Sequence, residues 1–397
     1  MTKPLKVLFV FLLVVVSFRF FDARFLNKSF MNYTVFYYSL VAIIISIPHV
    51  FIKRIGFVLP VQLICLSMLV SVVMAKIFWG QSLMDSIIVT VPLMLWIFFF
   101  YLLRIQISIK IVEEIILVYG VIYILLYFYQ ITHSQTAFFG ERDILTEDRG
   151  VVRIILGGGG IFFLSSFMAL NKFTTQKPGR WFWISLSILG ILIPILTATK
   201  QLIGGVLIIY LFHFIKDQSF FRKLVIIASF IGMLLYVSHS DNELVKGIIE
   251  SQENSFKEGK DYIRIRSGVY FLTEFSPNNI NMVLGNGVPY EGISDYGKFV
   301  ETLKKKVFYM SDVGIISVYI MFGILAIIAY ILIWIKSFTL SLPSEYYYLK
   351  YYLWFLLITS LTSYNVYSYN YLVSTVFVLY IYQTIYIEQI GMNVRQF

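Results

Sequence analysis

Residues 311–335 read SDVGIISVYIMFGILAIIAYILIWI, a run of 25 residues in which Asp312 carries the one charge. About 20 apolar residues span the hydrocarbon core of a bilayer, so this stretch predicts a transmembrane helix. The whole chain has the same character: 59% of its 397 residues are hydrophobic and 14% are charged, and the mean hydropathy is +0.80. Soluble domains are about 45–50% apolar and about 25% charged, which excludes a water-soluble globule.

Further apolar runs of similar length predict an all-α integral membrane protein with about 12 transmembrane helices. The first run, from Leu5 to Phe21, has Lys3 just before it and Lys6 near its start, which resembles the charged and hydrophobic regions of a signal peptide. Charged residues rather than a small-residue cleavage site come after it, so we predict a retained helix. The predicted spans are residues 5–22, 33–52, 56–75, 86–103, 110–131, 151–171, 181–198, 201–216, 220–238, 311–335, 350–366 and 370–388.

Basic residues gather in alternate loops between the predicted spans. Because cytoplasmic loops are enriched in lysine and arginine, this pattern predicts that both termini are cytoplasmic. The net charge of +10 is then mainly an orientation signal. No basic cluster interleaved with aromatic residues indicates a nucleic-acid partner. The predicted cytoplasmic loops carry Lys53, Arg54, Arg104, Lys110, Lys172, Lys177, Arg180, Lys216, Arg222, Lys223, Lys336 and Lys350.

One long polar stretch, residues 239–310, interrupts the apolar pattern and falls on the outer side. It divides the chain into transmembrane helices 1–9 (residues 1–238), this extracytoplasmic loop (239–310) and transmembrane helices 10–12 (311–397). The sequence from Ser240 to Glu243 fits a helix capping box, and Asp261 could cap a second helix that ends before Pro277. The GNG at 285–287 predicts a turn. We therefore expect a small helical subdomain at the outer mouth of the bundle.

Candidate cations lie near the outer face. Lys200, between two apolar runs in TATKQLIGG (197–205), is either a lysine snorkelling to the interface or an anion ligand. Arg264 and Arg266 fall on a predicted amphipathic helix whose apolar face carries Ile265, Val269 and Leu272. Residues two apart on a helix point about 200° away from each other, so one ligand should not contact both arginines. The alternative is a solvated face that pairs with neighbouring carboxylates.

Asp312 begins the tenth predicted span, where it either favours the helix dipole or serves as a general base that accepts a hydroxyl proton. SYNVYSYNY (363–371), which includes Tyr364 and Asn365, lies at the outer turn between the last two spans. Its tyrosines form either an interfacial aromatic belt or a surface on which sugars stack.

Several common chemistries have no sequence signal. The chain contains no P-loop, HExxH, GxSxG or dinucleotide fingerprint. Its single cysteine, Cys65, can form no internal disulfide, and no Cys/His cluster predicts a metal. Because no DxD-type pair stands out to hold a nucleotide sugar through a metal, a transferase here would use a lipid-linked donor and no cofactor.

The order of four elements resembles the O-antigen polymerase and O-antigen ligase family of bacterial envelope polysaccharide synthesis. A TxTK element, TATKQLIGG, begins the eighth predicted span, and a long outer loop follows one helix later. An arginine then precedes an aromatic residue and a G-x-G element (RSGVYF to LGNG), and SDVG with a later FG opens the tenth span. Together these elements cover residues 197–323.

The resemblance implies a metal-independent membrane glycosyltransferase of the second GT-C type in the bacterial cytoplasmic membrane. Such proteins transfer an undecaprenyl-diphosphate-linked glycan to a hydroxyl of another glycan, in contact with membrane lipids and in some systems with a chain-length regulator. Arg266 matches the family's loop arginine best, with Tyr270 four positions on, and Arg264 is the alternative. Lys200 stands where relatives commonly have arginine, so it would act as a point charge.

Asp312 occupies the region where ligases of the family have a histidine, which favours polymerase over ligase. The resemblance then implies that Lys200 and Arg266 neutralise the diphosphate leaving group and that Asp312 orients or deprotonates the acceptor. Tyr270, Tyr364 and Asn365 would contact the glycan. Ligase-type transfer to a lipid or protein acceptor, a lipid-linked oligosaccharide flippase or other transporter, and a non-catalytic scaffold are the alternatives.

Overall fold

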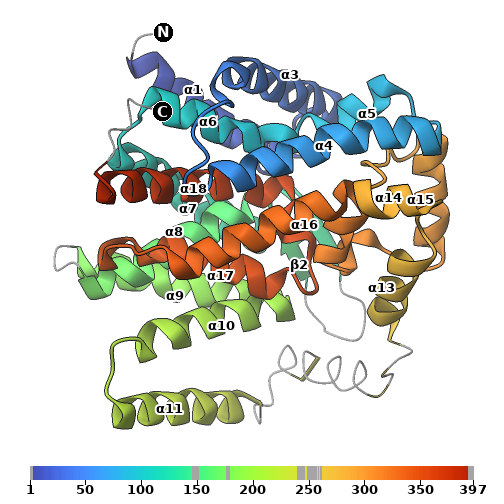
Figure 1. Ribbon diagram of the computed structural model, residues 1–397. Helices are drawn as coiled ribbons and strands as arrows, with labels where there is room; N and C mark the ends of the chain where they lie inside the picture. The colour runs from blue at the N-terminus through green and yellow to red at the C-terminus, as the bar shows by residue number, and fades with distance from the viewer. Residues whose placement is uncertain are drawn as a thin grey trace.

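The computed structural model describes residues 3–144, 152–175, 179–238, 246–247, 257, 259 and 262–391. The predicted capping box at 240–243 and the predicted cap at Asp261 lie outside these residues. The described elements are almost entirely helical (Figure 1). They are α1 (Lys3–Ser17), α2 (Arg19–Asp22), α3 (Lys28–Ser46), η1 (Ile47–His49), α4 (Val58–Trp79), α5 (Leu83–Thr90), η2 (Leu93–Ile97), α6 (Phe98–Ile105), α7 (Ile109–Thr132), β1 (Glu141–Ile144), β2 (Val152–Ile155), α8 (Gly159–Thr175), α9 (Arg180–Leu196), α10 (Lys200–Ile215), α11 (Phe220–Ser238), α13 (Ile263–Thr273), α14 (Asn279–Leu284), α15 (Asp295–Lys305), η4 (Met310–Asp312), α16 (Ile315–Thr339), η5 (Ser344–Tyr346), α17 (Tyr347–Thr359), η6 (Tyr364–Val366) and α18 (Tyr369–Gln389).

Among the described residues, five helices are long and apolar enough to cross a membrane. They are Lys28–His49, α4, α7, α16 and α18, and the pair α5 and α6, bent by 55°, supplies a sixth if it is one span. The chain is therefore a multi-pass membrane protein. The prediction of about 12 spans exceeds this number because several apolar runs form shorter helices, such as α9 with 17 residues and α10 with 16.

The stretch predicted as a span over 151–171 does not begin as a helix. Its first residues form β2, which pairs antiparallel with β1, with Glu141 opposite Ile155 and Ile144 opposite Val152. The helix α8 starts only at Gly159. Hydropathy alone could not distinguish a short strand from the start of a helix, because both are apolar here.

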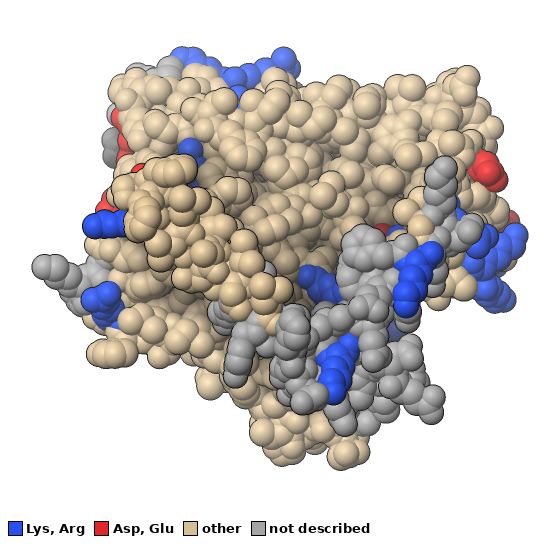
Figure 2. All heavy atoms as spheres, turned by 90° about the horizontal axis from the view of Figure 1, so that it is seen from below, with Lys and Arg blue, Asp and Glu red and all other residues tan. Residues whose placement is uncertain are grey.

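The helices run side by side, with both ends of the chain at one end of the bundle and α13, α14 and α15 at the other (Figure 1). Figure 2 shows a broad band without charged side chains across one face of the molecule. Most of the charged side chains in this view lie near the edges of that face. This distribution is expected for a bundle whose middle faces lipid, because a charge in the hydrocarbon core is costly.

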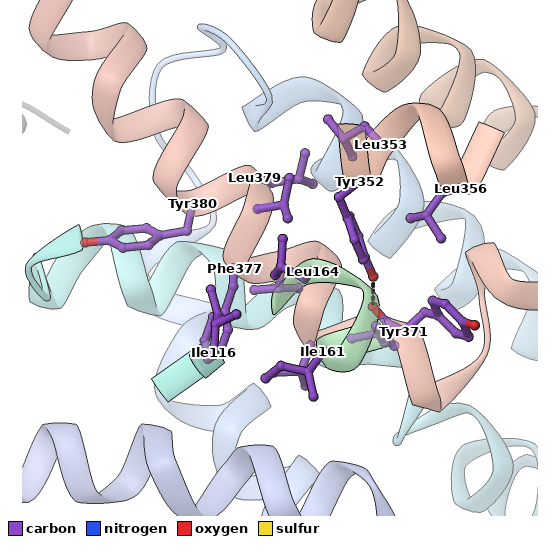
Figure 3. Close-up of a cluster of buried hydrophobic side chains, with 14 of the residues drawn as sticks. Ile116, Ile161, Leu164, Tyr352, Leu353, Leu356, Tyr371, Phe377, Leu379 and Tyr380 are labelled. Carbon is purple, nitrogen blue, oxygen red and sulfur yellow. Dashed lines mark hydrogen bonds between the residues drawn. The ribbon is translucent and has the colours of Figure 1, made fainter. Parts of the chain in front are cut away.

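The core is centred on α18. In its most apolar stretch 83% of the residues are buried, against 33–50% in the other four long helices. Leu164 of α8, Leu353 of α17 and Phe377 of α18 meet in this core (Figure 3). The Tyr352 hydroxyl donates to the Tyr371 carbonyl over 3.1 Å, so α17 and α18 are also joined by a polar contact.

The long helix α16 is broken at Gly323, where φ is 73° and ψ is −170°. The GNG segment 285–287, predicted as a turn, lies against this break instead. The Asn286 amide donates to the Ile320 carbonyl (2.8 Å), and the Gly287 amide donates to the Met321 carbonyl (2.9 Å). Backbone carbonyls that a helix break frees need a partner inside a membrane protein, and the loop supplies it.

The described residues between 262 and 313, together with Ile320 of α16, pack around a second, small core. Phe271, Tyr296 and Val300 are among its buried members, and Trp79, the last residue of α4, packs against it. Trp79 stacks on Tyr296 with ring centroids 4.4 Å apart, and its indole Nε1 donates to Asn286 Oδ1 over 2.9 Å. The helices α13–α15 are therefore fixed to both α4 and α16.

We expect Gly285→Ala to lower the stability of the folded protein. Gly285 has φ +87°, and a Cβ there would lie 2.5 Å from the Met321 carbonyl oxygen and 2.7 Å from the Gly323 amide nitrogen. A strained residue of this kind costs about 1–3 kcal/mol, and the backbone clash adds to it. Gly232→Ala is the matched control, because nothing lies within 4 Å of the added Cβ. The midpoint of thermal unfolding in detergent is measured for both variants. Equal midpoints for Gly285→Ala and Gly232→Ala would contradict the prediction.

Candidate functional site

A two-part cavity lies where β2, the α9–α10 connection, α13, η4 and the segment before α18 meet. Its inner part has a volume of about 330 Å³ and its outer part about 800 Å³. The inner part is also lined by Tyr123, Ser363, Tyr364, Asn365, Asn370 and Tyr371. The outer part is also lined by Lys200, Ile265, Val269, Leu272, Ile316 and Leu361. The residues that line both parts are Arg153, Thr199, Gln201, Arg264 and Asp312.

The connection between α9 and α10 presents a helix N-terminus to this cavity. α9 ends at Leu196 and α10 begins at Lys200, because Ala198 adopts a left-handed conformation with φ 49°. Lys200 and Gln201 are therefore in the first turn of α10, next to amides that carry partial positive charge. α10 has 16 residues, and the N-terminus of such a helix, with a lysine in its first turn, favours the binding of an anion.

Arg153, on β2, is a site residue that the sequence analysis missed. It lines both parts of the cavity, and its Nη2 donates to Thr199 Oγ1 over 3.2 Å. This bond ties the strand to the α9–α10 connection. Its position was a signal in the sequence, because Arg153 lies two positions inside the predicted span 151–171. An ionisable residue at membrane depth is a functional candidate.

The structure separates the two loop arginines. Arg264 lines both parts of the cavity, and its Nη1 donates to Gln201 Oε1 over 3.3 Å. Among the described residues it forms no ion pair. Arg266 is exposed and lines neither part, as the offset of about 200° requires. Arg266, which matches the resembled family better than Arg264 does, therefore lies outside the cavity.

Tyr270 also lies away from the cavity. Its ring stacks on Phe308 with centroids 5.1 Å apart, in the small core of the 262–313 region. Burial, followed by the charge of Glu274, raises the pKa of the Tyr270 phenol, so it stays neutral. The structure therefore gives this tyrosine a packing contact and no contact with the cavity.

Asp312 ends η4 and faces both parts of the cavity. Ser311 Oγ donates to its Oδ1 over 3.3 Å, and it forms no ion pair with the residues that the structure describes. Three basic residues, Arg153, Lys200 and Arg264, line the same cavity. Such an arrangement can hold an anion and still leave a carboxylate to accept a proton.

The segment before α18 forms the wall of the inner part. Tyr364 is 37% exposed, whereas Asn365 is 7% exposed and its Nδ2 has no hydrogen-bond partner among the described residues. Asn370 Oδ1 accepts from the Gly158 amide over 2.9 Å, which joins this segment to the start of α8. Lys200, Arg264, Asp312, Tyr364 and Asn365 therefore come together around one cavity.

In the parts of the chain that the structure describes, no group of three His, Cys, Asp or Glu residues could hold a metal ion. The fold and the cavity together define a class: a multi-pass membrane protein with a cation-lined cavity toward the α13 end of the bundle. A scan against protein-family models finds no match for this chain, and a search of curated proteins finds none either.

Proposed function

We propose that this protein is a polysaccharide polymerase. It transfers a glycan from undecaprenyl diphosphate to a hydroxyl of another lipid-linked repeat unit at the outer face of the bacterial cytoplasmic membrane. The observation that carries the proposal is the meeting of Arg153, Lys200, Arg264 and Asp312 around one cavity. These residues lie on β2, α10, α13 and η4, so only the fold unites them.

The three cations fit the leaving group. A diphosphate carries several negative charges, and its departure is favoured by cations that are already in position. Arg153 and Arg264 can each bind phosphate oxygens with two N–H groups, whereas Lys200 supplies a point charge. The amides at the start of α10 add to this positive potential. Arg264 takes the role that the family resemblance gave to Arg266.

The reaction balances without a further reactant. The acceptor hydroxyl oxygen bonds to the anomeric carbon of the donor glycan as the bond from that carbon to the diphosphate oxygen breaks. Asp312 accepts the hydroxyl proton. Undecaprenyl diphosphate leaves with the bonding electron pair, and the cations stabilise its added charge.

The apolar wall of the outer part fits the lipid. Ile265, Val269 and Leu272 lie along one face of α13 and are 40–55% exposed, and Leu361, which lines the same part of the cavity, is 71% exposed. An exposed apolar face beside cations is suited to a molecule with a hydrocarbon tail and an anionic head. In this proposal the shorter apolar helices, such as α1, α9 and α10, also lie in the membrane and complete a GT-C type B bundle.

Polymerase is favoured over ligase by Asp312, which stands where ligases of the resembled family have a histidine. A transporter is the second candidate, because broken helices are common in transporters and α16 is broken at Gly323. The carbonyls of Ile320 and Met321 beside that break are bonded to Asn286 and Gly287, however. They therefore do not form an open polar site for a transported ion or substrate.

The test uses purified protein in lipid nanodiscs with the lipid-linked repeat unit extracted from a strain that lacks this protein. We expect a ladder of longer lipid-linked glycans, without added metal or nucleotide sugar. The matched reaction contains Asp312→Asn protein and should give no ladder. Absence of a ladder with the unaltered protein would overturn the proposal. Movement of labelled lipid across the membrane of liposomes that contain the same purified protein would then favour the transporter.

A further inference from the structure

Gln201 is a neutral residue among the charged residues that line both parts of the cavity. It is the second residue of α10. Two side chains donate to its Oε1: Arg264 Nη1 over 3.3 Å and Thr362 Oγ1 over 3.4 Å. These bonds join the start of α10 to α13 and to the segment that follows α17.

The bond with Arg264 fixes which way round the Gln201 amide lies. A guanidinium has only donors, so the atom that accepts from it must be the amide oxygen. The amide nitrogen, Nε2, forms no hydrogen bond in the part of the chain that the structure describes. Nor is it one of the fully buried polar atoms that lack a partner, so it keeps accessible surface. Its two N–H groups are therefore available to a molecule in the cavity.

Thr199 is the other neutral residue that lines both parts, and its proton is already used. Its hydroxyl donates to the Thr197 carbonyl over 3.2 Å and accepts from Arg153 Nη2. Asp312 is an acceptor only when it is ionised. Of the neutral residues that line both parts, Gln201 is thus the one with a donor to offer a ligand.

A neutral acceptor beside Arg264 leaves the charge of this arginine available. A carboxylate at position 201 would form an ion pair with the guanidinium and cancel much of its attraction for an anion. The amide oxygen of Gln201 holds the guanidinium by a hydrogen bond without adding a negative charge. Gln201 can therefore position Arg264 through one atom and contact the same anion through another.

Resting on the proposed function, we infer that Gln201 binds the diphosphate of the donor directly. Its Nε2 donates to a phosphate oxygen, while its Oε1 holds Arg264 against the same anion. A bond of this kind, from an N–H group to an ionised oxygen, is stronger than one between two neutral groups. Gln201 is thus a diphosphate-binding residue as well as a positioning residue for Arg264.

The experiment measures binding, so that it does not depend on turnover. The protein in nanodiscs is titrated with undecaprenyl diphosphate and with undecaprenol, which has the same chain and no phosphate. Gln201→Met keeps most of the side-chain volume without the amide. We expect it to weaken the binding of the diphosphate about tenfold to hundredfold, the size of one hydrogen bond to a charged group. Its affinity for undecaprenol should be unchanged.

A double-mutant cycle separates the direct bond from the positioning of Arg264. If Gln201 acted only through Arg264, Gln201→Met would have no further effect in a protein that already carries Arg264→Met. We expect it still to weaken the binding of the diphosphate about threefold or more in that background. The reason is that Thr362 continues to hold Oε1, so Nε2 stays in place. An unchanged affinity there would overturn the direct bond.

Gln389→Met is the matched control. Gln389 is exposed at the end of α18, its Oε1 accepts from Ser341 Oγ over 3.3 Å, and it lines neither part of the cavity. The same substitution should therefore leave both affinities unchanged. If Gln201→Met weakens undecaprenol binding as much as diphosphate binding, the inference is overturned, because Gln201 then supports the shape of the cavity and not the anion.

The outcomes separate this inference from the proposed function. If the unaltered protein binds undecaprenyl diphosphate no more tightly than undecaprenol, the proposed function is overturned and the inference with it. If it binds the diphosphate more tightly and Gln201→Met does so equally well, the inference is wrong and the proposed function stands. If the affinities change as expected but no glycan ladder forms, Gln201 is a diphosphate ligand and the polymerase is overturned.

Discussion

Arg264→Ala is expected to lower polymer formation about a hundredfold to a thousandfold, the range seen when one preorganised donor to a developing negative charge is removed. The arginine lines both parts of the cavity and is positioned by its bond to Gln201. Its guanidinium can bind a diphosphate with two N–H groups. The measurement is the initial rate of ladder formation by purified protein, with polymer amount in a complemented deletion strain as the cellular readout.

The neighbouring arginine is the matched control. Arg266→Ala removes the same charge from the same helix, two residues away, but from an exposed side chain outside the cavity. We expect its rate to stay within about twofold of the unaltered protein, because an exposed charge contributes little. Arg264→Lys should retain part of the activity, since lysine keeps the charge without the planar fork. A large loss for Arg266→Ala with none for Arg264→Ala would reverse the assignment.

Asp312→Asn is expected to reduce the rate of the chemical step by about a hundredfold to ten-thousandfold, the usual contribution of a positioned general base. The amide is nearly isosteric with the carboxylate but cannot accept the hydroxyl proton. Donor binding should be unchanged or tighter, because the substitution removes a negative charge from a cavity that holds a diphosphate. Single-turnover kinetics and a separate binding titration distinguish these two effects.

A loss of binding equal to the loss of rate would contradict this role and make Asp312 a structural residue. Asp312→Glu is the control, because it keeps a carboxylate one methylene further along. We expect it to recover part of the rate. Full activity of Asp312→Asn would show that another group accepts the proton.

The sequence determined the chemical class of the protein and the helices that build it. Exposing long uninterrupted apolar runs to water would cost too much free energy, so these runs lie in a membrane. Each of the 12 predicted stretches contains a helix. The helical period also predicted that Arg264 and Arg266 point in different directions. With 3.6 residues per turn, residues two positions apart lie on nearly opposite sides of a helix. These properties depend on residues close in the chain, so they can be read from the chain itself.

Tertiary structure decided the lengths of the spans and the membership of the cavity. β2 replaces the start of a predicted span because Val152–Ile155 finds a partner strand in β1. Arg153 becomes a cavity residue because β2 meets Thr199, which lies 46 residues further along. The break at Gly323 depends on a loop about 35 residues away in the chain that bonds the carbonyls beside it. Contacts between distant segments depend on how the helices pack, and hydropathy and local spacing carry no information on that packing.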